Sequence, residues 1–313
     1  MTALLDIDRV SVHIPLKSGF LQSPLSLRAV EDVSLKVGRS ETLAIVGESG
    51  SGKSTLGYVV AGLRKQTAGN VRFNSSRAAA PGENPAQIIF QDPFSALDPR
   101  MTVGEIVAEP LRLRSIGQKE RLGRAANVLE QVGMPADAAR RYPHQFSGGQ
   151  RQRIAIARAL IGEPELIVAD EPLSALDVSI QSKILNLLAD IKDQHGISYF
   201  FISHDLGVVH HLADRVAVLY LGRLMEVAPR DEIFRTPSHP YTQALLDAVP
   251  RIGRGRRKHQ ALKGEIPTPL APPPGCVFNT RCPRAQDICR RERPALLPAP
   301  GRPGQLAACH FKD

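Results

Sequence analysis

The sequence has no tryptophan, and aromatic residues make up only 5% of its 313 residues. It also lacks any run approaching the roughly 18 to 20 apolar residues that a membrane-spanning helix needs. The first eight residues include two aspartates, whereas a signal peptide starts with basic residues and an apolar stretch. We therefore expect a soluble, cytoplasmic protein. The hydrophobic content of 42% suffices for a full core, which predicts one large domain with a smaller appendage.

Cysteine is scarce as well, and all four cysteines lie near the C-terminus, at Cys276, Cys282, Cys289 and Cys309. A reducing compartment disfavours disulfides, so a metal ion or a cluster has to be considered. The same tail holds the whole net charge of +9, because residues 251–313 contain thirteen basic and four acidic residues. This basic tail could be a solvated surface, a contact to lipid head groups or membrane partners, or a nucleic-acid site. Few aromatics accompany the bases, which argues against nucleic acid.

The rest of the sequence alternates between strand and helix patterns. Apolar, β-rich runs at 4–12 and 29–37 predict an antiparallel β region ahead of residue 46. Later apolar runs at 166–169, 199–202 and 216–221 are separated by helical stretches, the pattern of a mostly parallel sheet with crossover helices. The predicted fold class is therefore α/β, with a mostly parallel core sheet and an antiparallel β subdomain.

Two further parts complete the predicted organisation. Between Val103 and Tyr142 apolar residues recur at helical spacing, which indicates a helical subdomain over about 92–160. Ten of the 25 prolines fall in the last fifth of the chain, where we expect a linker and a small appendage. We thus predict a main domain at 1–250 and a Pro-rich, basic, four-cysteine extension at 251–313. No internal repeat is present.

A glycine-rich loop follows the apolar run 43–46 and fits the pattern G-x-x-x-x-G-K-[ST]. The glycines permit turns that bring backbone N–H groups onto phosphate oxygens, and the start of the next helix favours anions. Lys53 would reach the β and γ phosphates of a nucleoside triphosphate, and the Ser54 hydroxyl would bind Mg²⁺. The alternative is an ordinary strand-to-helix turn. The loop residues are Gly47, Glu48, Ser49, Gly50, Ser51, Gly52, Lys53, Ser54 and Thr55.

Two adjacent carboxylates, Asp170 and Glu171, end the apolar strand predicted at 166–169. A strand buried on both faces has no reason to end in adjacent acids unless a cation or a reacting water uses them. Asp170 is placed to hold Mg²⁺ together with Ser54. Glu171 is the candidate general base that orients the attacking water. The alternative is a strand that runs into a charged turn.

A second anion-binding pattern begins at Ser147. The serine predicts a helix N-cap, and the two glycines after it let the backbone approach a phosphate at the helix start. One chain needs only one such loop for its own nucleotide, so a second implies a second phosphate surface. The residues of this motif are Ser147, Gly148, Gly149 and Gln150.

With these motifs the chain resembles the ATP-binding cassette (ABC) family, whose signature is Ser-Gly-Gly-Gln. Three further motifs of the family stand in the right order: Gln91 for the glutamine loop, residues 174–177 for the D-loop and His204 for the switch histidine. In this family two cassettes pack head to tail, and each ATP lies between the glycine loop of one and the signature of the other. The resemblance implies a chain that binds ATP with Mg²⁺ and hydrolyses it.

The resemblance also divides the site residues between two nucleotides. Residues 47–55 with Gln91, Asp170, Glu171 and His204 would act on one ATP. The signature residues Ser147, Gly148, Gly149 and Gln150, with Asp177 of the D-loop, would serve the ATP of the partner cassette. Gln91 would sense Mg²⁺ and the attacking water, and His204 would hold the γ-phosphate. Hydrolysis would then depend on closure of the pair.

Two more segments, 91–103 and 239–242, resemble the ATPases of dipeptide, oligopeptide and nickel importers, as does the four-cysteine tail. The resemblance implies transport of dipeptides or oligopeptides, with nickel or another small solute as the alternative. Its partners would be a second ABC ATPase, more often a homologous chain than a copy, two transmembrane permease subunits, an external solute-binding protein and no nucleic acid. The chain would lie peripherally on the cytoplasmic face of the inner (plasma) membrane. Phe94 and the helix from Val103 would help to form a groove for a permease helix.

The cysteines are separated by 5, 6 and 19 residues, without the short C-x-x-C pairs of zinc ribbons. Some members of the importer subfamily carry a four-iron cluster on the matching cysteines of the tail. The resemblance therefore suggests a [4Fe–4S] cluster on Cys276, Cys282, Cys289 and Cys309. Zinc and unligated packing cysteines are the alternatives.

Two other functions compete with transport. ABC ATPases that act on DNA or ribosomes usually have two cassettes in one chain or a long coiled coil, and this chain has one uninterrupted cassette. The signature and His204 argue against a P-loop kinase or GTPase.

The expected contact to adenine departs from the family pattern. His13 and Ile14 stand where an aromatic residue is expected, and Phe20 lies further along the chain.

Overall fold

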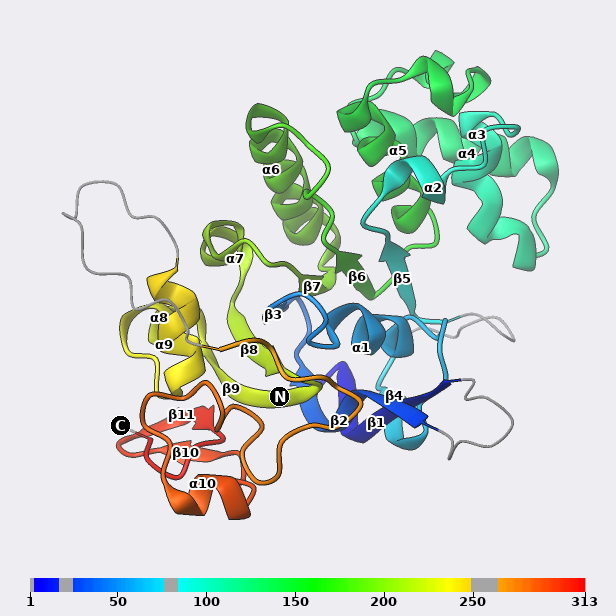
Figure 1. Cartoon of the computed structure of the whole chain (residues 1–313). Coiled ribbons are helices and arrows are strands. Elements are labelled where there is room, and N and C mark those ends of the chain that lie inside the picture. The colour runs from blue at the N-terminus through cyan, green and yellow to red at the C-terminus, as the bar shows by residue number, and fades with distance from the viewer. Residues whose placement is uncertain (1–2, 17–24, 76–83, 249–263, 313) are drawn as a thin grey trace.

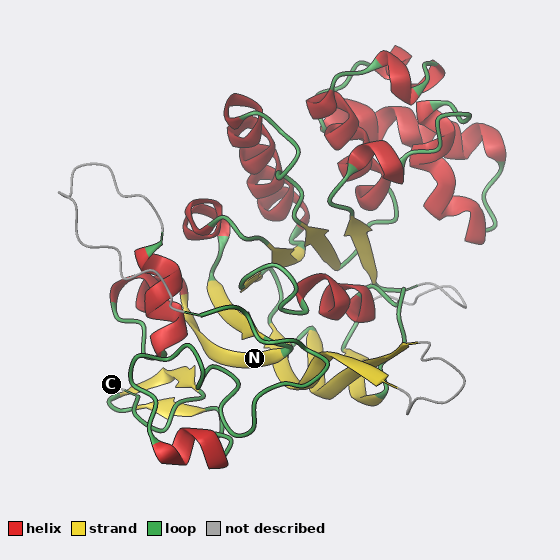
Figure 2. Cartoon of the chain, in the orientation of Figure 1, coloured by secondary structure: helices red, strands yellow, loops and turns green. Residues whose placement is uncertain are grey.

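The computed structural model describes residues 3–16, 25–75, 84–248 and 264–312 (Figure 1). Two sheets occupy the centre of the molecule, and a group of helices stands apart from them at one end (Figure 2). The C-terminal residues gather at the opposite end, beside the strands β8 and β9 of the larger sheet (Figure 1). Among the described residues, no helix is both long and apolar enough to cross a bilayer.

The smaller sheet is antiparallel and has the strand order β2-β1-β4. In β1 the buried Leu5 and Ile7 alternate with the half-buried Asp6 and Asp8, as expected where one face of a sheet packs on a core. The antiparallel β region predicted from the sequence is confirmed. The bounds are Leu5–Leu16 for β1, Leu25–Val37 for β2 and Ala68–Phe73 for β4.

The larger sheet has eight strands in the order β10-β11-β9-β8-β3-β7-β6-β5, and the last five run parallel. Every residue of β3, β6 and β7 is buried, because helices or the small sheet cover both faces. The three strands predicted for this sheet are confirmed within one residue at each end. The parallel strands are Thr42–Val46 (β3), Ala86–Ile89 (β5), Leu166–Asp170 (β6), Ser198–Ile202 (β7) and Arg215–Tyr220 (β8).

Three helices pack close to the parallel strands. Helix α1 (Lys53–Val60) packs on β6 and β7, where Gly57 lies so close that a Cβ would come within 2.7 Å of the Ile202 side chain. Helix α6 (Val178–His195) ends at Gly196, whose φ of 64° is a left-handed cap that suits glycine. Helix α7 (Leu206–Leu212) begins at Asp205, whose carboxylate accepts from two backbone N–H groups.

The helical subdomain lies between β5 and β6 in the chain. Thr102 and Glu105 form a capping box at the start of α3, which explains where that helix begins. Val103 and Ile106 of α3 are fully buried in the helical core, so they do not line an open groove as we expected, whereas Phe94 is 58% exposed. The elements are α2 (Pro93–Ala96), α3 (Val103–Ala108), α4 (Gln118–Gln131), α5 (Gly148–Leu160) and the 3-10 turns Glu109–Leu113, Ala136–Arg140 and Pro143–Gln145.

The C-terminal extension continues the large sheet. Strand β11 pairs with β9 so that Leu306 lies opposite Val227, and β10 pairs with β11. Residues 249–263 lie outside the described residues, and they include the boundary that we predicted at residue 250 and the first part of the extension, 251–263. The elements of this end are β9 (Arg223–Pro229), α8 (Arg230–Arg235), α9 (Pro240–Asp247), α10 (Asp287–Arg291), β10 (Leu297–Ala299) and β11 (Arg302–Ala307).

Candidate nucleotide site

The glycine loop joins β3 to α1, at the carboxyl end of a parallel strand, where open α/β sheets bind ligands. Gly52 has a φ of 100°, and a Cβ on it would lie 2.1 Å from the carbonyl oxygen of Ala29. A Cβ on Gly47 would approach the carbonyl oxygen of Leu219 to the same distance. Only glycine fits at these two positions, so the sequence fixes a loop that lies tightly against its neighbours.

Lys53 is the first residue of α1, and its side chain folds back over the loop. Its Nζ donates to the carbonyl oxygens of Gly47 and Glu48, each at 2.9 Å. Burial lowers the pKa of the Lys53 ammonium, while the carboxylates of Glu171 and Asp170 act in the opposite direction. A buried ammonium with only carbonyl acceptors is well placed to exchange them for phosphate oxygens, because a charged acceptor makes the stronger hydrogen bond.

Ser54 and Asp170, the two residues that we expect to hold Mg²⁺, lie in contact with each other. The Ser54 Oγ donates to Asp170 Oδ1 at 2.8 Å, and Asp170 is 1% exposed at the end of β6. Burial raises the pKa of the Asp170 carboxyl, and hydrogen bonds from Ser54 and Tyr58 oppose this rise. A hydroxyl and a carboxylate are the hard oxygen donors that Mg²⁺ prefers, so the donor set fits this ion.

Glu171 is the meeting point of the other predicted residues. Gln91 Nε2 donates to Glu171 Oε2 at 3.1 Å, and His204 Nδ1 lies 3.0 Å from the same oxygen. The Glu171 backbone has a φ of 45°, a left-handed conformation that costs a non-glycine residue on the order of 1 kcal/mol or more. Its N–H donates to the carbonyl of Ile202 at 3.0 Å, which holds this strained turn in place. The turn points the carboxylate off the strand toward Gln91 and His204.

These residues surround one pocket of about 610 Å³. Its wall includes an apolar side that sequence reasoning largely missed, formed by Leu27, Ala29 and Pro269 in addition to Ile14. His13 does not line the pocket, because its Nε2 lies 2.8 Å from Glu31 Oε2, and Phe20 lies outside the described residues. The pocket is lined by Ile14, Leu27, Ala29, residues 49–55, Gln91, Glu171, His204 and Pro269.

The signature residues do not reach this pocket. Ser147 caps α5, where it forms a reciprocal capping box with Gln150, and both residues are exposed. A Cβ on Gly149 would lie 2.6 Å from the side chain of Ile180, so the start of α5 packs against the start of α6. Asp177, the exposed N-cap of α6, therefore lies close to the signature. The structure brings the signature and the D-loop together on one surface, apart from the glycine-loop pocket.

The four cysteines converge on one cavity in the C-terminal extension, beside His239 and Phe278. The cavity has a volume of about 10 Å³, roughly the space of a single water molecule. Burial raises the pKa of the Cys276 thiol to about 11. In the part of the chain that the structure describes, no group of three or more His, Cys, Asp or Glu side chains is arranged to hold a metal ion. The predicted [4Fe–4S] cluster is thus not supported, because the thiols surround too little space for it.

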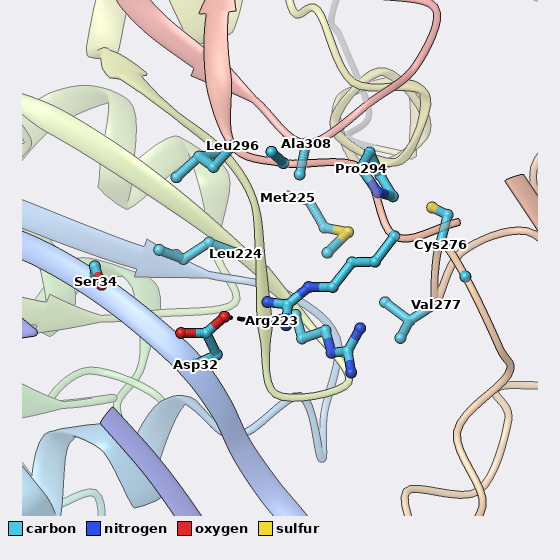
Figure 3. A pocket seen from close by; sticks show the side chains of 13 residues that line it. Asp32, Ser34, Arg223, Leu224, Met225, Cys276, Val277, Pro294, Leu296 and Ala308 are labelled. Atoms are coloured by element: carbon cyan, nitrogen blue, oxygen red, sulfur yellow. Dashed lines mark ion pairs between the residues drawn. The ribbon is translucent and has the colours of Figure 1, made fainter. Parts of the chain in front are cut away.

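A second pocket lies on another side of the extension (Figure 3). It has a volume of about 370 Å³, and β2, β9 and the extension contribute its walls. Two residues of its lining form an ion pair, in which Arg293 Nη1 lies 3.1 Å from Asp32 Oδ2. Cys276 is the one residue of our predicted sites that lines it.

Comparison with known proteins agrees with the geometry. A family model described as ABC transporter matches residues 30–174. A second model, the oligopeptide/dipeptide transporter C-terminal region, matches residues 225–289.

Similar proteins cover the whole chain. A Brucella ovis protein named for peptide import is 49% identical, over 98% of this chain and 98% of its own length. A dipeptide transport ATP-binding protein of Haemophilus influenzae is 45% identical, over 100% of this chain and 98% of its own. Among solved structures, a dimeric ATP-binding cassette in a post-hydrolysis state with ADP and phosphate gives a TM-score of 0.61 at 29% identity, covering 72% of this chain and 98% of that one.

The resemblance drawn from the motifs is therefore confirmed, together with the α/β cassette fold. The two sequence relatives match at least 98% of this chain and 98% of their own length. The chain belongs to the ABC transporter family, as an ATP-binding subunit whose ATPase activity is coupled to transport.

Proposed function

We propose that the chain powers an importer for dipeptides or oligopeptides, and that it completes each ATP site only together with a second cassette. The observation that carries this proposal is the separation of the two phosphate-binding motifs. The glycine loop faces a pocket that Glu171 and His204 share, while Ser147 stands exposed on another surface. One molecule thus offers two halves of a site that do not meet within it.

The phosphate chain of ATP would lie on the N–H groups of residues 49–55, with Lys53 at its terminal phosphates. Ser54 and Asp170 would hold Mg²⁺, with Gln91 close to it. Held there, Mg²⁺ would neutralise the negative charge that develops on the phosphate oxygens. The adenine would lie on the apolar wall of Ile14, Leu27 and Pro269, which supplies the surface that an aromatic residue provides elsewhere in the family.

Glu171 would accept a hydrogen bond from the attacking water and draw its proton as the bond to phosphorus forms. In the structure its Oε2 has two partners, Gln91 and His204, which hold the carboxylate at the edge of the pocket. His204 would then turn its ring toward the γ-phosphate, as its 61% exposed side chain permits. Phosphoryl transfer needs mainly positioning and neutralised charge, and these side chains supply both.

Ser147, Gly148, Gly149, Gln150 and Asp177 would bind the γ-phosphate held by the glycine loop of the partner cassette. The solved relative that is a dimer with ADP and phosphate supports this arrangement. We propose a homologous chain, in preference to a second copy, as the partner. Two transmembrane permeases and an external solute-binding protein would complete the importer, and the chain would lie on the cytoplasmic face of the inner membrane.

The permease contact is proposed at the glutamine loop. Phe94 is exposed, and the guanidinium of Arg151 lies 4.0 Å from the centre of its ring, which fixes the ring at the surface. An aromatic side chain held this way can pack against an apolar helix of a permease. Because Val103 is buried, Phe94 and its immediate surroundings form this contact without the α3 side chains.

Reconstitution tests the proposed solute. The chain is co-expressed with the permeases and the second cassette encoded beside it, purified, and placed in vesicles with the external binding protein. We expect di- or oligopeptides to stimulate ATP hydrolysis and to accumulate on the side of the cassettes. Stimulation by Ni²⁺ and not by peptides would replace the peptide with nickel as the solute. Co-purification with nucleic acid or ribosomes, without permeases, would refute transport altogether.

For the C-terminal extension we propose a [4Fe–4S] cluster on the four cysteines. Its support is the convergence of four thiols on one cavity, a donor set that suits iron. Loading would require the thiols to move apart and lose their protons, Cys276 in particular because its pKa is about 11. Anaerobic purification with iron analysis and a visible spectrum decides the matter. A folded, colourless protein without iron or zinc would leave packing as the role of the cysteines.

A further inference from the structure

The C-terminal extension reaches the glycine loop through one arginine. Arg281 donates to both carboxylate oxygens of Glu48, the second residue of the loop, with Nη1 to Oε2 at 2.6 Å and Nη2 to Oε1 at 3.0 Å. The Arg281 side chain is 6% exposed and that of Glu48 is 23% exposed. A two-pronged pair of this kind fixes orientation as well as distance, and burial keeps water from competing for it. The partners are 233 residues apart in the chain.

The surroundings of Arg281 are rigid. Its guanidinium lies 5.8 Å from the ring centre of Tyr220, and Tyr220 packs on Tyr241 with ring centres 4.7 Å apart. Phe278 of the extension is fully buried against both rings. The Tyr241 hydroxyl accepts from the backbone N–H of Glu48 at 2.9 Å. The extension and α9 therefore hold both the side chain and the backbone of this loop residue.

Charge gives these contacts a consequence for nucleotide binding. Glu48 places a carboxylate directly before residues 49–55, which line the pocket, and an unneutralised carboxylate there would repel a polyphosphate bound on the loop. The same carboxylate attracts the Lys53 ammonium, and the Glu48 carbonyl already accepts from Lys53 Nζ at 2.9 Å. Without Arg281, Glu48 would compete with the phosphates for Lys53. With Arg281 in place, Glu48 is paired and Lys53 remains available.

We propose that Arg281 is a positioning residue for ATP binding: it neutralises Glu48 and locks the start of the glycine loop, so the extension is a working part of the nucleotide site. This inference rests on the proposed role of the glycine loop. It goes further by assigning a part in ATP binding to the cysteine-bearing extension, in which Arg281 directly precedes Cys282.

Titration of the full-length chain with ATP in the absence of Mg²⁺, which prevents hydrolysis, tests the proposal. Arg281→Gln should raise the Kd for ATP roughly tenfold, because it leaves an unpaired carboxylate at the start of the glycine loop. Glu48→Gln should lower the Kd, because it leaves a spare guanidinium there. The double variant Glu48→Gln/Arg281→Gln should return within about threefold of the unmodified chain, because the charges cancel again. Arg290→Gln, which breaks an exposed pair with Asp287 in the same extension, is the matched control and should leave the Kd unchanged.

Several results would overturn the proposal. If the Arg281–Glu48 pair were merely structural, both single variants and the double variant would lose ATP affinity or melting temperature. The double variant would then not recover the affinity of the unmodified chain. If Arg281→Gln does not fold, Arg281→Lys retains the positive charge, and it should bind ATP within a few fold of the unmodified chain; a tenfold loss there contradicts the charge argument. Lys53→Ala separates the two proposals. If it binds ATP normally, the role of the glycine loop fails, whereas loss of binding with no effect in the Arg281 series refutes only this inference.

Discussion

The two surfaces that we assign to nucleotide binding differ in how complete they are within one molecule. In the glycine-loop pocket the side chains are already bonded to one another, as in the pairs Ser54–Asp170 and Gln91–Glu171. On the signature surface Ser147 is exposed, and Asp177 caps α6 without a side-chain hydrogen bond to it. The first surface is built by this chain alone, whereas the second presents its polar groups outward.

This difference indicates which parts of the proposed ATP site one chain builds alone and which parts it offers to a partner. Asp170, which we propose to hold Mg²⁺, is buried at the end of β6, and Glu171, the proposed base, follows it directly and is half-buried. Positions that only complete a phosphate shell stand at helix starts on the outside, where another molecule can reach them. Changes in the first surface should therefore affect binding or chemistry in the isolated chain, and changes in the second should appear only in the assembly.

The largest effect is expected from Glu171→Gln. Loss of the proposed base should lower ATP hydrolysis by the assembled transporter about 10³-fold, a typical size for removal of general base catalysis. ATP binding should persist, because no phosphate contact is removed. Phosphate release and nucleotide binding are the two measurements, and Glu120→Gln on the exposed face of α4 is the control. Hydrolysis within tenfold of the unmodified assembly would remove Glu171 from the role of base.

Lys53→Ala should act on binding in the isolated chain. The variant loses charge-assisted hydrogen bonds to the terminal phosphates, which should weaken ATP affinity roughly 10- to 100-fold. Lys65→Ala, in the exposed segment after α1, should bind as tightly as the unmodified chain. Equilibrium titration with ATP measures both. An unchanged Kd for Lys53→Ala would mean that the phosphates lie elsewhere.

Ser147→Ala probes the signature surface. We expect the opposite of the result for Lys53→Ala, which weakens ATP binding by the isolated chain. Binding of ATP to the isolated chain should stay the same, while hydrolysis by the assembly should fall about tenfold through the loss of one hydrogen bond to the partner's phosphate. Helix α5 should lose about 1 kcal/mol of stability with its cap, so the melting temperature is recorded alongside. Weaker ATP binding by the isolated chain would contradict the division of the two surfaces.

The last prediction concerns the structure that supports the glycine loop, and it affects stability rather than ATP binding or hydrolysis. His239 is fully buried at the start of α9, where its Nδ1 accepts from the N–H of Tyr241, and burial lowers its pKa to about 3. The unfolded chain, with a histidine pKa near 6.5, binds a proton between these values that the folded chain excludes. The contribution to stability is therefore complete above about pH 6.5 and is lost toward pH 3, by about 1.4 kcal/mol per pH unit.

His239→Asn tests this prediction, because asparagine can also cap the helix but does not titrate. The free energy of unfolding is measured from pH 7 to pH 4 by denaturant titration. The variant should have a shallower slope than the unmodified chain, while its stability at pH 7 should change little. Equal slopes would show that His239 is protonated in the folded chain.

The sequence was sufficient wherever a short pattern fixes local geometry. The glycine loop needs Gly47 and Gly52 because backbone atoms of Ala29 and Leu219 leave no room for a side chain, and that requirement is visible as a motif. The parallel strands were visible as apolar runs because helices or the small sheet cover both of their faces. The proposed Mg²⁺ ligands followed from carboxylates at the end of such a run.

Contacts between segments that are far apart in the chain leave no comparable pattern in the sequence. Pro269 lines the nucleotide pocket, and Arg281 pairs with Glu48, from a tail that looked like a separate appendage by its proline content. His239 and Tyr241 were noticed as a family element, yet their burial and the bond from the Tyr241 hydroxyl to the loop could not be read from spacing. For the cysteines the converse holds: the pattern that suggested a metal site does bring the four thiols together, but around a cavity of only about 10 Å³, so the cluster stays a prediction.

The pairing of β11 with β9 has a consequence for biosynthesis. Strand β9 is synthesised some 70 residues before β11, so one edge of β9 stays unpaired until β11 has left the ribosome. A chain truncated before β11 would leave this edge of β9 exposed. Unpaired strand edges can pair with strands of other molecules and so lead to aggregation. Emergence of β11 is thus the step that covers this edge of β9.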